Sequence, residues 1–300
     1  MVVRARPRSI AWMSRAVLIA LSMLAWTTPA LLHQNRDVVY VAVADNRGRP
    51  VSGLTASDFD ISIDEKRQEI LSVAPATEPV SVVLLTDRLG LVNNYSHIDL
   101  QRALSSFVSR VRSAVPGSRF GLTTFDGPVV RLLTFDAAPA ELDRQLGRLT
   151  TLATDAALLD ALTEACKQMG KAPTERRIIL LVYAGYRSDT SVAQPELIGA
   201  MLQASGASLW AIEARIPGES ISRQVNRDLV VDRGTAITGG RLDSAASAVG
   251  VNTMASQIAA LVGSQYAVTY GPGGGTRASQ RKVVVKRPEL KVYAPAWLPR

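Results

Sequence analysis

The chain has 300 residues, of which 47% are apolar and 20% are charged, and this composition is ordinary for a globular protein. The formal net charge is +8, but residues 1–30 hold four arginines and no acid, so the rest of the chain carries +4. No run of Lys and Arg is interleaved with aromatic residues, which argues against nucleic acid as the partner.

The first 30 residues have the organisation of a secretory signal peptide. Arginines come first, the apolar run AVLIALSMLAW follows over residues 16–26, and small residues stand at Thr28 and Ala30. This run of 11 residues is shorter than the about 20 that a membrane-spanning helix needs. We therefore expect secretion to the periplasm, the cell envelope or the medium. The alternative is that residues 1–30 stay attached as an N-terminal anchor, the one expected contact with a membrane.

Residues 37–76 are predicted to form a small β module. The stretch DFDISID alternates apolar and polar residues, which is the period of a half-buried strand. About 40 residues of strands bury little surface alone, so this module should pack against the next segment of the chain. Asp58, Asp60 and Asp64 lack the glycine and the distal glutamate of a calcium loop, and we interpret them as a solvated strand face.

Strands and helices alternate over residues 79–272, and several of the strands are apolar on both faces. Such strands are typical of a parallel sheet that helices cover on both sides. The turn DGP joins two strands near Gly127 and predicts a hairpin. We therefore predict an α/β fold with a doubly wound, mostly parallel open sheet and one antiparallel edge strand. Residues 273–300 are predicted as a C-terminal β-hairpin extension, in which RKVVVKR pairs back onto SQYAVTY.

The single cysteine, Cys166, excludes an internal disulfide. It shares one helical face with Leu158, Leu162 and Met169, so we expect a small buried apolar residue there rather than a reactive thiol.

The order of several short motifs resembles a bacterial family of secreted proteins with a von Willebrand factor type A (VWFA)-related domain. VADNRGRPVSGLTASDFDISIDEKRQEI resembles the opening of that family. The later segments ALLDAL (157–162), AITGGR (236–241) and IAALVGSQYAVTYGP (258–272) resemble its further landmarks. The resemblance covers nearly the whole chain after residue 37. It implies a von Willebrand factor A or Rossmann-like sheet with a metal-ion-dependent adhesion site (MIDAS) at its carboxyl edge, where ligands of such sheets bind.

In the family, the metal loop reads Asp-x-Ser-x-Ser, a threonine and a later aspartate complete the site, and a partner protein supplies an acidic ligand. Matched to that pattern, Asp87 is the first carboxylate. Leu89 and Leu91 stand at the serine positions, Ala156 at the threonine position and Ala184 at the later aspartate position. Magnesium requires octahedral oxygen coordination, which these side chains do not supply. The resemblance therefore implies a degenerate, metal-free site.

Other oxygens are available near this edge, and they leave an alternative open. Asn93 and Asn94 follow the strand that Asp87 ends, and a rearranged site could combine Asp87 with Asp155 or Asp189. In that alternative the chain would be a metal-dependent adhesion protein that binds Mg²⁺. In the main interpretation no cofactor is expected.

No catalytic motif is present: Gly-x-Ser-x-Gly, His-Glu-x-x-His and the phosphate-binding P-loop are all missing, and the two histidines are His33 and His97. A hydrolase built on paired carboxylates stays open, but we expect no enzyme. The predicted function is a secreted or envelope module that binds an unknown protein partner through the degenerate edge. A membrane-anchored structural envelope protein is the further alternative.

Overall fold

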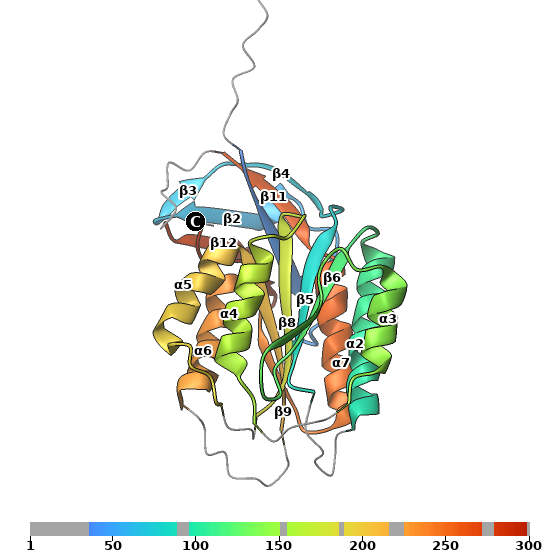
Figure 1. The fold of residues 1–300 in the computed structure, drawn as a ribbon. Coiled ribbons are helices and arrows are strands. Elements are labelled where there is room, and N and C mark those ends of the chain that lie inside the picture. Colours follow the sequence, from blue (N-terminus) through green and yellow to red (C-terminus); the bar gives the residue numbers. More distant parts are fainter. Residues whose placement is uncertain are drawn as a thin grey trace, which may run out of the picture. The chain divides into compact units, whose positions relative to one another are not determined.

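The computed structural model describes residues 36–88, 96–150, 155–185, 189–215, 225–271 and 279–298 (Figure 1). Its main element is a six-stranded sheet in the order β10-β9-β8-β5-β6-β7. All neighbouring strands in it are parallel except β6 and β7, which form the predicted hairpin. The predicted fold class is therefore confirmed. The strands are β5 (Val80–Thr86), β6 (Arg119–Thr124), β7 (Val130–Leu133), β8 (Arg176–Ala184), β9 (Ala207–Ala214) and β10 (Leu242–Ala245).

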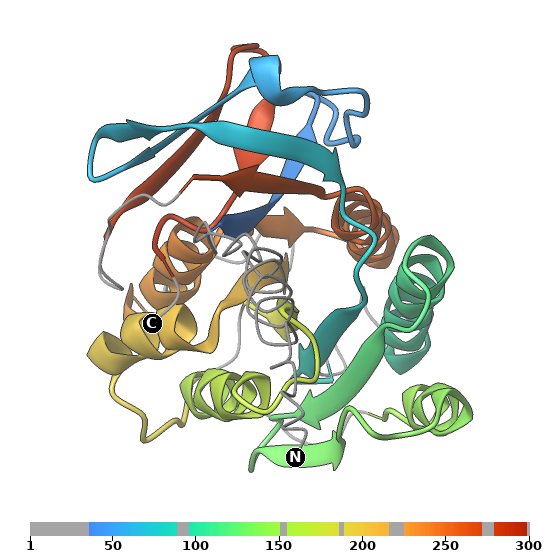
Figure 2. The ribbon, with the colours of Figure 1, turned by 90° about the horizontal axis from the view of Figure 1, so that it is seen from above.

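Helices cover both faces of this sheet, and Figure 2 separates them into two groups. One group packs around a core cluster with Phe107 and Leu146, and the other around a cluster with Leu162 and Leu202. The first group is α2 (His97–Ala114), α3 (Pro139–Gly147) and α7 (Ala248–Gly263). The second is α4 (Leu158–Met169), α5 (Pro195–Ser205) and α6 (Val225–Thr238).

The two-sided cover explains why the central strands are apolar at every position. Leu84 and Leu85 follow each other in β5, are both 0% exposed, and belong to opposite core clusters. Successive side chains of a strand point to opposite faces, so both faces of β5 must be apolar. Burial of each leucine contributes about 2 kcal/mol to stability.

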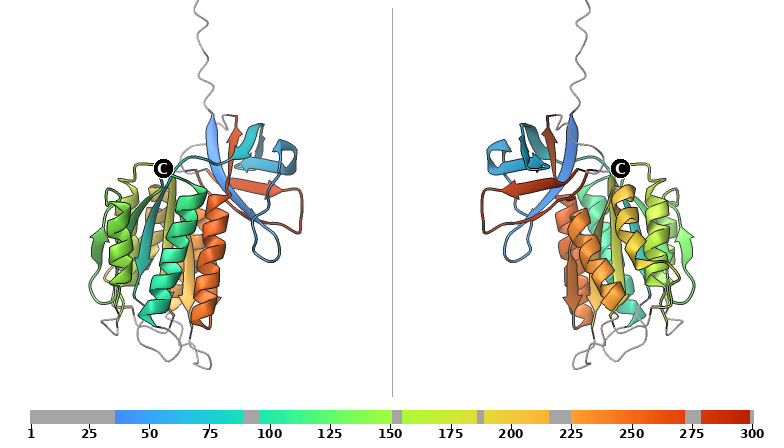
Figure 3. Two further views of the ribbon diagram at one scale, coloured as in Figure 1. Left: turned by 90° about the vertical axis from the view of Figure 1, so that its right-hand side faces the viewer. Right: turned by 90° about the vertical axis from the view of Figure 1, so that its left-hand side faces the viewer.

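Two small antiparallel sheets combine strands from both ends of the described chain (Figure 3). In one, β1 (Asp37–Ala44) lies between β11 (Tyr266–Tyr270) and β13 (Lys291–Tyr293), and β4 (Ile70–Pro75) pairs with β11. In the other, β2 (Phe59–Ile63) lies between β3 (Lys66–Gln68) and β12 (Arg281–Val285). A short 3-10 helix, Ala56–Asp58, precedes β2. Strands from the three predicted segments, 37–76, 79–272 and 273–300, therefore pair with one another in these two sheets.

The expected hairpin between β11 and β12 is wrong, because β12 pairs with β2 instead. The alternation in β2 is the reason: Ile61 and Ile63 are buried, and their partners in β12 are Val283 and Arg281. The pairing completes the third core cluster, which contains Phe59, Ile61 and Val285.

Helix α6 is a second difference, since the sequence predicts no helix over 225–238. Its apolar residues do not repeat at helical spacing. At its contact with α5 the helix has Gly234, where there is no room for a side chain. A Cβ on Gly234 would lie 2.8 Å from Leu202 Cδ1. After the helix, a Cβ on Gly240 would lie 1.8 Å from the Leu209 carbonyl oxygen, so only glycine fits that close approach.

Arg176, at the start of β8, joins the small sheets to the six-stranded sheet. Its side chain is 2% exposed. One terminal nitrogen donates to the Glu78 carbonyl at 2.6 Å and the Ala76 carbonyl at 3.3 Å. The other donates to the Val262 carbonyl at 2.8 Å and Gln265 Oε1 at 2.9 Å. A single guanidinium thus ties β8 to the segment before β5 and to the end of α7.

Cys166 is buried on α4 beside Leu158, Leu162 and Met169, which confirms the sequence-based interpretation. Burial raises the pKa of its thiol to about 12. The thiolate, which is the reactive form, is therefore scarce at neutral pH.

Within the described ranges, no helix combines the length and the apolar character needed to cross a bilayer. The predicted signal peptide or anchor, residues 1–30, lies outside those ranges.

Candidate functional site

The candidate site lies where the parallel strands end, at the carboxyl edge of the six-stranded sheet. Asp87 follows β5, and Ala184 is the last residue of β8. Of the predicted site residues, Asp87, Ala156, Ala184 and Asp189 are described. The others, Leu89, Leu91, Asn93 and Asn94, fall outside the described residues.

Asp87 is fully buried and holds two strand ends together. Its Oδ2 accepts a hydrogen bond from the Ala184 backbone N–H at 2.8 Å. Ala184 is 1% exposed and contributes a methyl group where the resemblance implies a carboxylate. At this end of β8, the Asp87 carboxylate therefore has a structural role between neighbouring strands.

Arg88 brings a fixed positive charge into the same edge. Its Nε donates to Asp126 Oδ1 at 2.6 Å, and the two side chains are 16% and 0% exposed. The backbone of Arg88 is left-handed, with φ of 59°, a conformation that costs a residue other than glycine about 1 kcal/mol. Asp126 Oδ2 is buried with no hydrogen-bond partner among the described residues. Arg88 therefore compensates the charge of a carboxylate that is shut off from water.

Ala156 lies between two of the acidic residues, as the partner of Asp126 in one isolated bridge and of Asp189 in another. It is 2% exposed, and its methyl group offers no ligand to a cation. Asp189 Oδ1 accepts from the Leu158 N–H at 3.2 Å and from the Ser191 N–H at 3.0 Å. Asp189 thus helps to cap the start of α4.

Asp155 also lies close to this edge, since its carbonyl accepts from the Gly127 N–H at 3.0 Å. In the part of the chain that the structure describes, no three His, Cys, Asp or Glu side chains lie together in a way that could hold a metal ion. The described residues do not fit Mg²⁺, which needs about six oxygen ligands. Asp126 is paired with the Arg88 guanidinium. The side chains of Ala156 and Ala184 are methyl groups, which cannot bind a cation.

Several exposed apolar side chains lie near the same end of the sheet. They lie at or near the starts of helices that follow parallel strands, or in the segment before α5, and they belong to both faces of the sheet. Figure 1 shows α2 and α7 side by side, with their first turns at the same end. We call this set the apolar edge; it comprises Ile98 (53% exposed), Val192 (90%), Leu197 (55%), Leu229 (40%) and Val249 (76%).

The sequence predicts a site at this edge but does not indicate two features of the edge. Arg88 directly follows Asp87, yet its pairing with Asp126 depends on a contact across 38 positions of sequence. The apolar edge was missed because its members are single residues at helix starts, where periodicity gives no signal. A check for apolar residues two positions after each N-cap would have found Ile98 after Ser96 and Val249 after Ser247.

No family model matches the sequence, and no curated protein matches it. Several solved structures have a similar fold. Their sequence identities to this chain are low, so the similarity concerns the fold alone. One is proximal thread matrix protein 1 from the mussel byssus, solved with a zinc-occupied MIDAS motif. Its identity is 13% and its TM-score 0.49, over 67% of this chain and 50% of that one.

Two bacterial structures show the same level of similarity. The PilB minor pilin from Streptococcus sanguinis has 10% identity and a TM-score of 0.48, over 63% of this chain and 62% of that one. A von Willebrand factor type A structure from Catenulispora acidiphila has 12% identity and a TM-score of 0.46, over 87% and 75%. The present chain thus spans less than two thirds of the mussel protein and of the pilin.

Proposed function

We propose that this chain is a non-catalytic module of the cell exterior or envelope that binds a protein partner without a metal ion. The binding surface is the carboxyl edge of the six-stranded sheet. The observation that carries the proposal is the apolar edge, because exposed apolar patches on soluble proteins often mark interaction surfaces.

Most of these residues form two pairs near the same end of the sheet, one pair on each face. Ile98 and Val249 are the second residues of α2 and α7, two helices that pack against each other and begin at the same end. Leu197 and Leu229 lie near the starts of α5 and α6, which also pack together. A partner that covers these side chains removes their apolar area from water, at about 25 cal/mol per Å².

Arg88 supports independence from metal. A cation placed near Asp87 and Asp126 would meet the guanidinium charge already present there. The ion pair between Arg88 and Asp126 would also have to break. The buried Asp126 carboxylate would then lose its charged partner. In our proposal, the guanidinium holds this edge together where the related site would use a metal ion.

The cellular location and the lack of catalysis are parts of the same proposal. They rest on the basic and apolar pattern of residues 1–30 and on the missing catalytic motifs in the sequence.

Photocrosslinking in the host cell tests the binding surface. Benzoylphenylalanine in place of Val249 should crosslink to a partner protein, whereas the same residue in place of Val284 should not. Val284 is a matched control, because it is 40% exposed on β12, away from the edge.

Once the partner is purified, the double variant Ile98→Asp/Val249→Asp should bind it about 30-fold more weakly than the wild type, the effect of losing about 2 kcal/mol. Val284→Asp should change the affinity less than about twofold.

The same binding measurement in EDTA tests metal independence, and we expect an unchanged Kd. Equal crosslinking from both positions would place the partner elsewhere on the chain. Loss of binding in EDTA, restored by Mg²⁺, would favour the alternative of a rearranged metal site.

A further inference from the structure

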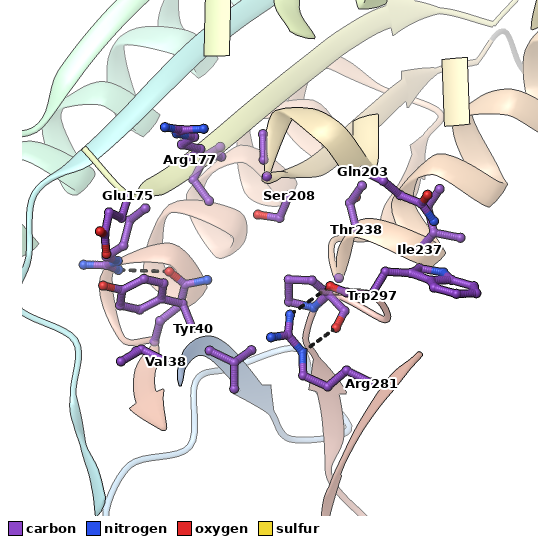
Figure 4. A pocket seen from close by; sticks show the side chains of 18 of the residues that line it. Val38, Tyr40, Glu175, Arg177, Gln203, Ser208, Ile237, Thr238, Arg281 and Trp297 are labelled. Atoms are coloured by element: carbon purple, nitrogen blue, oxygen red, sulfur yellow. Dashed lines mark hydrogen bonds between the residues drawn. The ribbon is translucent and has the colours of Figure 1, made fainter. Parts of the chain in front are cut away.

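A cavity of about 480 Å³ lies at the opposite end of the sheet, where β8 and β9 begin. Figure 4 shows Val38 and Tyr40 on one side of it and Ile237 and Trp297 on the other. They come from β1, from the end of α6 and from the segment after β13. The volume is in the range of small-molecule sites, and walls with two aromatic rings suit an apolar, ring-sized body.

Two polar side chains of the lining have hydrogen-bond donors that no described acceptor uses. Ser208 is 8% exposed, and its Oγ accepts from Trp210 Nε1 at 3.0 Å, which leaves its own proton to donate. Gln265 is 4% exposed, and its Oε1 accepts a hydrogen bond from Arg176. The amide N–H groups of Gln265 remain available as donors. No further acceptor for either appears among the described residues. A ligand that brings acceptor oxygens would pair with these donors.

Arg281 adds charge to this donor set. Its side chain is 5% exposed and lies below the space between the two walls in Figure 4. Its Nε donates to the Pro295 carbonyl at 3.1 Å, and its terminal nitrogens donate to Tyr270 Oη and the Trp297 carbonyl, each at 3.2 Å. Each terminal nitrogen carries two N–H groups, so one on each is left for a ligand.

The cavity as a whole favours an anion. Its charged lining consists of Arg36, Arg176, Arg177 and Arg281 with Asp37 and Glu175, a formal charge of +2. We propose that this cavity binds a small amphipathic carboxylic acid, with its ring between Tyr40 and Trp297 and its carboxylate toward Ser208 and Arg281. Guanidinium and carboxylate match in charge and in hydrogen-bond geometry. The site is separate from the carboxyl edge and does not rest on the function proposed there.

Calorimetric titration of the full chain with naphthoate tests this site, with naphthylmethanol as the uncharged analogue. Naphthoate should bind at one site per chain, at least about tenfold more tightly than the alcohol, a difference of about 1.4 kcal/mol. No saturable binding of naphthoate, or equal affinity for the alcohol, would overturn the proposal.

Two variants locate the binding. Gln203 lines the cavity and its side chain makes no hydrogen bond to a described residue, so Gln203→Glu adds a negative charge with little change in shape. It should weaken naphthoate binding about tenfold or more through like-charge repulsion. Gln194→Glu, the same change at the other end of α5, should alter the Kd less than about twofold.

Val38→Trp places a large ring in the mouth of the cavity from a half-exposed strand position and should abolish binding of both compounds. Circular dichroism and thermal unfolding check that each variant is folded. Unchanged naphthoate affinity in folded Gln203→Glu or folded Val38→Trp would overturn the assignment of the site.

Discussion

Replacement of Arg176 by methionine is expected to lower the free energy of unfolding by about 3 kcal/mol or more. Methionine keeps the apolar stem but removes the donors that now satisfy the Ala76, Glu78 and Val262 carbonyls and Gln265 Oε1. Each buried acceptor left without a partner costs about 1–3 kcal/mol. Release of the buried charge offsets part of this loss, so the expected total is smaller than the sum.

Urea unfolding of the two proteins measures this difference. Arg119→Met is the matched control, because Arg119 starts β6 at the same end of the sheet but is exposed. It should change stability by less than about 0.5 kcal/mol. If both variants lose the same small amount, Arg176 does not hold the small sheets to the six-stranded sheet.

Replacement of Arg88 by alanine has the second large expected effect, a loss of about 3 kcal/mol. It leaves the Asp126 carboxylate, whose side chain is 0% exposed, without its charged partner. The double variant Arg88→Ala/Asp126→Ala should regain most of this loss, because neither charge then remains buried alone.

The double-mutant cycle isolates the coupling between the two side chains, and we expect about 2–3 kcal/mol. Arg102 and Asp99 form a partly exposed pair on α2, with side chains 65% and 28% exposed, and serve as the control cycle, with an expected coupling below about 1 kcal/mol. Similar coupling energies in the two cycles would mean that Arg88 is an ordinary surface charge and not a replacement for a cation.

The sequence predicts local elements well here because their causes are local. Leu84 and Leu85 show on their own that β5 is covered on both faces, and Phe59, Ile61 and Ile63 show the buried face of β2. The sequence predicts the pairing between distant strands less well. β12 has an apolar pattern compatible with β11 or with β2, and the tertiary packing of the third core cluster decides between them.

The candidate site divides in the same way. The resemblance places Asp87, Ala156 and Ala184 at one edge; in the structure Asp87 bonds to Ala184, and Ala156 is bridged to Asp126 and Asp189. The role of each oxygen depends on partners that the sequence does not indicate: the Ala184 N–H for Asp87, and Arg88 for Asp126. The cavity near Arg281 was missed entirely, since its lining comes from segments scattered between residues 36 and 297.

Calorimetric titration of the full chain with Mg²⁺, Mn²⁺ and Ca²⁺ tests the metal-free account of the carboxyl edge most directly. We expect no saturable heat at micromolar concentrations of any of the three ions, because Asp126 is paired with Arg88 and the side chains of Ala156 and Ala184 carry no oxygen. Saturable micromolar binding in the wild type that disappears in Asp87→Ala would contradict the account.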